Sequence, residues 1–166
     1  MVNQDLLTRN IIHNLLGSFI DNVNSINAIE IAKSRNIKIS TLQNDQPSEY
    51  NTLIRLILTT DRRSRSVAGS IFGGQSRIVE IKGIKIDAEL GNFNVYLTNK
   101  DKVGVINSVT QVLTKNNINI ATFNLGRVSP EGEAIALIQT DQICDEPILN
   151  YLRKIKNVNQ VKSIVI

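Results

Sequence analysis

The sequence lacks several residue types on which common enzyme chemistries depend. Its 166 residues include one cysteine, Cys144, one histidine, His13, and no tryptophan. A single cysteine excludes an internal disulfide and a cysteine-based zinc cage. A single histidine leaves few routes to acid–base catalysis near neutral pH. Serine nucleophile elbows, HExxH motifs and CxxC motifs are also missing, so we expect no catalytic residue and no metal site in this chain.

Aromatic residues and long apolar runs are scarce as well. Aromatics make up only 4% of the chain, so its core must consist mainly of Ile, Leu and Val. Neither a run long enough to cross a bilayer nor the layout of a signal peptide is found. The net charge is spread evenly, with 11 basic and 9 acidic residues in 1–90 and 8 and 6 in 91–166. We therefore expect a cytoplasmic protein that binds neither membranes nor nucleic acid.

Residues 1–90 predict a small α+β domain with an antiparallel sheet. Helical spacing of apolar residues predicts a helix over 4–17, and residues 28–35 have the composition of a second helix. A short strand is expected over 38–42, followed by a polar loop over 43–49 that contains Pro47. Strands separated by short turns then predict a meander. Its strands are expected near residues 53–60, 66–72, 77–81 and 84–88.

Residues 91–166 predict a second domain with the element order βαββαβ. This order is that of the ferredoxin-like split unit, in which two helices pack on one face of a four-stranded antiparallel sheet. A hinge at 90–92 separates the two domains. The expected strands cover 93–98, 118–128, 133–140 and 161–166, and the expected helices cover 104–115 and a segment that starts near 145.

The loop from Asn99 to Gly104 is the first candidate site, because it joins a strand to a helix. Free backbone N–H groups and the helix dipole favour an anion at such a loop. Asp101 is a candidate N-cap of the helix, and its carboxylate could also hold an ammonium group. The combination suits the two ends of an amino acid.

Asn119 follows the helix of this second domain and has two interpretations. It could be an ordinary turn residue, or it could approach the Asn99–Gly104 loop of another copy if two units pair side by side. The spacing alone leaves both open.

Arg62, Arg63 and Arg65 form a basic cluster on one turn, with Arg77, Lys82 and Lys85 on neighbouring strands. A solvated hairpin tip is the simpler interpretation of such surface charge. The alternative is an anion-binding pocket for a phosphorylated metabolite, because arginine presents paired donors to phosphate.

Two stretches resemble known regulatory domains. Residues 93–166, with NKDKVGVI at 99–106 and NINIA at 117–121, look like an ACT domain, a small amino-acid sensor. Upstream, RSVAGSIFGG at 65–74 and RIVEI at 77–81 resemble the intervening domain of the longer D-3-phosphoglycerate dehydrogenases. The tandem of these two domains is more specific than an ACT domain alone.

The resemblance implies the C-terminal regulatory segment of an enzyme of L-serine biosynthesis. In that family L-serine binds between the ACT domains of two subunits and inhibits hydride transfer elsewhere. By motif, Asn99 and Asp101 would face the serine, the backbone amides near Val103 and Gly104 would take its carboxylate, and Asn119 would come from the other subunit. The implied partners are L-serine or a similar amino acid, a second copy, and catalytic dehydrogenase domains. NAD would belong to those domains, and this chain is expected to hold no cofactor.

The sequence departs from the family at several positions. Val103 stands where the family usually has proline, which leaves the loop less rigid. Ile84 and Glu89 occupy places where some members have arginine, whereas Arg77 fits a basic position. Two alternatives therefore stay open: a structural oligomerisation module with a decayed amino-acid site, and the regulatory part of an iron–sulfur L-serine dehydratase.

Overall fold

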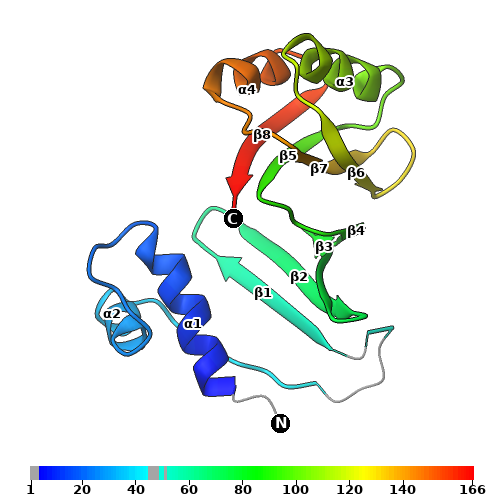
Figure 1. The fold of residues 1–166 in the computed structure, drawn as a ribbon. Helices are drawn as coiled ribbons and strands as arrows, with labels where there is room; N and C mark the ends of the chain where they lie inside the picture. The colour runs from blue at the N-terminus through cyan, green and yellow to red at the C-terminus, as the bar shows by residue number, and fades with distance from the viewer. Residues whose placement is uncertain (1–3, 45–48, 51) are drawn as a thin grey trace. The chain divides into compact units, whose positions relative to one another are not determined.

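Figure 1 shows the fold as a computed structural model, which describes residues 4–44, 49–50 and 52–166. Contacts divide the chain into two compact units, Met1–Pro47 and Ser48–Ile166. The predicted division between 1–90 and 91–166 falls inside the second unit and stays a prediction. Most of the expected loop over 43–49, including Pro47, lies outside the described residues.

The first unit contains the two predicted helices, α1 (Gln4–Gly17) and α2 (Ala28–Ser34). Ile12 and Leu16 of α1 pack with Ala28 and Ala32 of α2 in a small core. The expected strand over 38–42 was wrong, because these residues belong to no strand of the described chain. Ile39 packs against the helical core instead, and the described residues of this unit form no strand that could pair with the segment.

The second unit begins with the predicted antiparallel meander. Its strands lie in the order β1-β2-β3-β4. Two turns of two residues each close the β2–β3 and β3–β4 hairpins, at Gly73-Gly74 and Lys82-Gly83. All four turn residues have positive φ, as the tight hairpin turns compatible with strand twist require. The strands are β1 (Leu53–Thr59), β2 (Ser64–Phe72), β3 (Gln75–Ile81) and β4 (Ile84–Ala88).

The rest of this unit has the predicted ferredoxin-like fold. Its sheet has the order β6-β7-β5-β8, so that the first and third strands of the βαββαβ unit lie in the centre. The two helices lie together along one side of the sheet in Figure 1. Val95 and Leu97 of the central strand pack with Leu113 and Leu152 of the helices. The elements are β5 (Phe93–Lys100), α3 (Val105–Lys115), β6 (Ile120–Arg127), β7 (Glu133–Thr140), α4 (Glu146–Arg153) and β8 (Val158–Val165).

Strand β4 covers part of the opposite face of this sheet. Ile84 and Ile86 of β4 pack with Ile135 and Leu137 of β7, and all four are buried. Gly126 of β6 lies so close to the carbonyl oxygen of Lys85 that a Cβ atom there would collide with it. The meander and the ferredoxin-like sheet therefore share one apolar core within the second unit.

None of the helices in the described part of the chain is long and apolar enough to cross a membrane.

Candidate functional site

The β5–α3 loop begins with a buried amide. Asn99 is only 4% exposed, and its Nδ2 donates a 2.8 Å hydrogen bond to the carbonyl oxygen of Lys100. The backbone N–H of Lys100 donates to the carbonyl oxygen of Asn157 at 2.9 Å. The start of the loop is thus anchored by the end of β5 and by the turn before β8.

Asp101 is not the N-cap of α3, so this prediction was wrong. Gly104 occupies the cap position with φ of 89°, and no side chain caps the helix there. The N–H of Asp101 donates a 2.8 Å hydrogen bond to the carbonyl oxygen of Gly132, which ties the residue to the β6–β7 hairpin. Its carboxylate accepts a 2.7 Å hydrogen bond from Nη1 of Arg127 at the end of β6.

The Arg127 guanidinium holds the pKa of the Asp101 carboxyl below its usual value. The side chain of Asp101 is 24% exposed, so the group is accessible as well as ionised. The backbone N–H of Glu131 also interacts with this carboxylate, and the lone pairs that these two donors leave can accept a hydrogen bond from a cation.

The end of the loop offers donors. Among the described residues, no hydrogen bond is made by the backbone N–H of Val103 or of Gly104. The Val103 side chain is fully exposed, so it does not cover these groups. Unpaired N–H groups at the start of a helix are suited to a carboxylate.

Asn119 lies far from this loop within one chain. Its Nδ2 donates a 2.6 Å hydrogen bond to Asp141, and its N–H donates to Oε1 of Gln142 at 3.1 Å. Strand β7 pairs Ala134 with Asn99 at one end, whereas Thr140, next to Asp141, pairs with Phe93 at the other end. At the rise of a strand, the six steps from Ala134 to Thr140 separate the two ends by about 20 Å. One copy therefore cannot bring Asn99 and Asn119 to the same small ligand.

The structure separates the arginines of the basic cluster. Arg77 on β3 donates to Asp87 at 2.7 Å and to Glu89 at 2.6 Å, and these carboxylates raise its pKa. Its charge is therefore already compensated. Arg62 and Arg63 lie in the β1–β2 turn and Arg65 lies at the start of β2. None of the three pairs with a carboxylate of the described chain.

Comparison with known proteins identifies the first part of the chain. The family described as the D-3-phosphoglycerate dehydrogenase intervening domain matches residues 1–82. A D-3-phosphoglycerate dehydrogenase of Bacillus subtilis is 34% identical over 162 residues, which cover 95% of this chain and 30% of that protein. The chain is thus a homologue of the C-terminal regulatory segment of D-3-phosphoglycerate dehydrogenases, and it spans 30% of that relative's length.

Two further matches were found. A probable L-serine dehydratase, beta chain, of Bacillus subtilis is 28% identical over 138 residues, which cover 82% of this chain and 63% of that protein. The crystal structure of the ACT domain from GTP pyrophosphokinase of Chlorobium tepidum aligns at 22% identity and a TM-score of 0.37. It covers 43% of this chain and 95% of that chain.

Several residues at the candidate site were not anticipated from the sequence. Arg127 contacts Asp101 from a position 26 residues downstream, and Asp141 and Gln142 hold Asn119 from 22 and 23 residues away. Strand pairing creates these contacts, and no local pattern in the sequence marks them.

Proposed function

We propose that this segment binds L-serine where the ACT domains of two copies meet and thereby inhibits a D-3-phosphoglycerate dehydrogenase. One observation carries the proposal: a single loop presents an ionised carboxylate, Asp101, and unpaired N–H groups at Val103 and Gly104. The carboxylate complements an ammonium group and the N–H groups complement a carboxylate, so the loop matches a zwitterion at both ends.

The second copy would supply Asn119. Because Asn119 lies at the opposite end of the sheet from Asn99, it can complete the site only on another copy. Asp141 already accepts from Nδ2 of Asn119, which leaves the amide oxygen to meet a donor such as the serine hydroxyl.

Inhibition would then be a coupling free energy between this site and a distant active site. The catalytic dehydrogenase domains, with their NAD, would be the partners of this segment. L-serine, as the product of the pathway, would thereby inhibit its own synthesis.

Calorimetric titration with L-serine tests the proposal, with glycine and L-alanine as controls for the hydroxyl. We expect saturable binding of L-serine that Asp101→Ala abolishes while sedimentation still shows the dimer. Glu131→Gln is the matched control, because Glu131 is a carboxylate on the nearby hairpin that pairs with Lys102. A flat titration with an intact dimer would favour a structural oligomerisation module instead.

The likeness to a serine dehydratase beta chain supports a second candidate, the regulatory part of an iron–sulfur L-serine dehydratase. Purification of the protein from its native source distinguishes the two. Reduction of NAD by the purified protein would favour the dehydrogenase, whereas the absorption of an iron–sulfur cluster would favour the dehydratase.

A further inference from the structure

Strand β1 forms one edge of the meander and has a partner on one side only. Among the described residues it pairs with β2 alone (Figure 1). Alternate backbone N–H and C=O groups of an edge strand point away from the sheet, so these groups of β1 lack a partner strand. The pairing with β2 runs from Leu53 to Thr59 without a bulge. The free edge is therefore regular and long enough to pair with another strand.

Apolar side chains are exposed on both faces of β1. Ile57, for example, is 60% exposed. The exposed residues are Leu53 and Ile57 on one face and Ile54 and Leu58 on the other. A helix packed against the sheet would cover one face only. A strand added at the edge would contact the side chains of both faces, so this edge suits another extended segment.

The opposite edge of the meander is protected, which makes β1 the exception. Strand β4 alternates the charged Lys85 and Asp87 with buried residues. It also lies against β6, where Gly126 approaches the carbonyl oxygen of Lys85. Charge and coverage are two of the ways in which native proteins prevent an edge from pairing with another chain.

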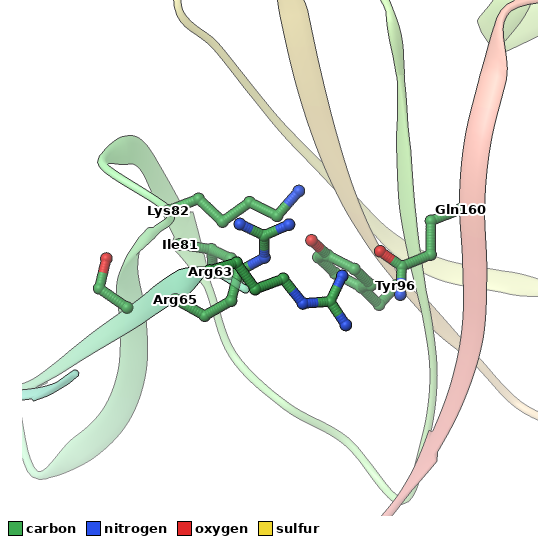
Figure 2. A pocket seen from close by; sticks show the side chains of 7 residues that line it. Arg63, Arg65, Ile81, Lys82, Tyr96 and Gln160 are labelled. Atoms are coloured by element: carbon green, nitrogen blue, oxygen red, sulfur yellow. The ribbon is translucent and has the colours of Figure 1, made fainter. Parts of the chain in front are cut away.

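Neither protection is found on β1. Its sequence contains no lysine and no proline, and its one charged residue, Arg55, donates from Nη2 to Glu80 at 2.7 Å within the same sheet. The cations that follow β1 are directed elsewhere. Figure 2 shows the side chains of Arg63 and Arg65 pointing toward Tyr96 of the ferredoxin-like sheet. The edge is thus apolar and carries no charge that would repel a second strand.

We propose that β1 pairs antiparallel with β1 of a second copy, so that two four-stranded meanders form one continuous sheet. A two-fold axis at Leu56 gives the register that pairs every residue of the strand. It places Ile54 opposite Leu58 of the second copy and Ile57 opposite Arg55. No like charges face each other in this register, so the strand is complementary to itself. The interface shares no residue with the β5–α3 loop and is independent of the proposed serine site.

Disulfide cross-linking of Leu56→Cys tests the pairing and its register. Residues directly opposite in antiparallel strands have Cα atoms about 4.5–5.5 Å apart, which a disulfide can span. We therefore expect a covalent dimer on mild oxidation. The parent chain is one control, because its single cysteine, Cys144, is buried. Leu58→Cys is the matched control on the same strand. It should cross-link far less, because it would face residue 54 of the second copy.

Sedimentation equilibrium of three variants tests the contribution of the exposed side chains. Ile57→Lys should weaken self-association at least about tenfold, because it removes a buried isoleucine from each copy and places an ammonium group opposite Arg55. Ile57→Glu should weaken it less, because its carboxylate would face the same arginine. Ile71→Lys should leave it unchanged, because Ile71 is similarly exposed, at 56%, but lies one strand in from the edge.

Several results would overturn the proposal. One is the absence of a cross-linked dimer of Leu56→Cys at protein concentrations up to about 100 μM. Another is equal cross-linking of Leu58→Cys, which would indicate random collision. Equal losses in Ile57→Lys and Ile57→Glu would exclude the register. Unchanged association in Ile57→Lys would mean that another segment covers β1. Because Ile57→Lys should bind L-serine as the parent does, the two proposals can fail separately.

Discussion

Arg127 donates a 2.7 Å hydrogen bond to Asp101, which joins the end of β6 to the loop before α3. This pair positions the carboxylate that the proposed amino-acid site requires, and it makes the pH dependence of the ion pair predictable. The pKa of Asp101 is lowered from 3.8 in the folded protein. The pair therefore contributes stability above that pH, and the contribution is lost as the pH falls through the lower folded pKa.

We accordingly expect Asp101→Asn to be less stable than the parent at neutral pH, with a difference that shrinks as the pH falls below 3.8. Urea unfolding followed by circular dichroism at several pH values measures it. Glu131→Gln serves as the charge-matched control. A difference that persisted unchanged in acid would show that the ion pair is not its cause.

Val103→Pro should stabilise the loop but weaken L-serine binding, because proline lacks one of the two N–H groups that we propose hold the carboxylate. The N–H of Val103 makes no hydrogen bond within the described chain and its side chain is fully exposed, so proline removes no contact of the folded chain itself. Proline restricts the unfolded chain, which raises the free energy of unfolding by about 0.4–1 kcal/mol. Thermal unfolding and calorimetry check both effects, with Val103→Ala as a control that keeps the N–H. Unchanged binding in the proline variant would assign the carboxylate contact to the N–H of Gly104 alone.

Gly126→Ala should destabilise the second unit by about 1–3 kcal/mol, as overpacking does. The new methyl group would collide with the carbonyl oxygen of Lys85, which is backbone and cannot rotate away. Chemical unfolding followed by circular dichroism measures the loss. Gly17→Ala is the control, because its nearest atom would lie 3.8 Å away, at ordinary contact distance. Equal stability of the two variants would contradict the close approach of β4 and β6.

Asp145→Ala should cost about 1 kcal/mol by removing the N-cap of α4. Oδ1 of Asp145 accepts a 3.1 Å hydrogen bond from the N–H of Ile148, and Pro147 lies in the first turn of the helix. The same unfolding measurement applies. Glu146→Gln is the control, because it removes a charge from the same turn and leaves the cap intact. It should reduce the stability less than Asp145→Ala does. A larger loss in Glu146→Gln would exclude capping as the main cause.

Much of the fold could be predicted from the sequence, because a half-buried strand or helix requires apolar residues at a regular spacing, and this spacing is visible in the sequence. Val95 and Leu97 alternate with residues of the opposite face, and Val105, Val109 and Leu113 follow the helical repeat. The two wrong predictions have the same cause: contacts with residues distant in the sequence outweigh the local pattern. Ile39 shows the apolar alternation of a strand, but it packs on helices, and Asp101 has the composition of a cap, but Gly132 and Arg127 hold it elsewhere.

The residues of the candidate sites could be predicted only where they lie close together in the sequence. Asn99, Asp101 and Gly104 lie on one loop and could be found from its motif. A cavity between the meander and the ferredoxin-like sheet combines Arg65 with Tyr96 and Gln160, which are 31 and 95 positions further along the chain. Only the packing of one sheet on another brings these side chains together, and the spacing of residues does not encode that packing.

Asn99 and Asn119 mark opposite ends of one sheet. A ligand that contacts both residues would bind at the interface between two copies, and a two-fold symmetric dimer would contain two such sites. Response would then depend on how much of the protein is present, because dilution would leave only half-sites. Lowering the concentration of the protein would then reduce its response, without any change in the concentration of the amino acid.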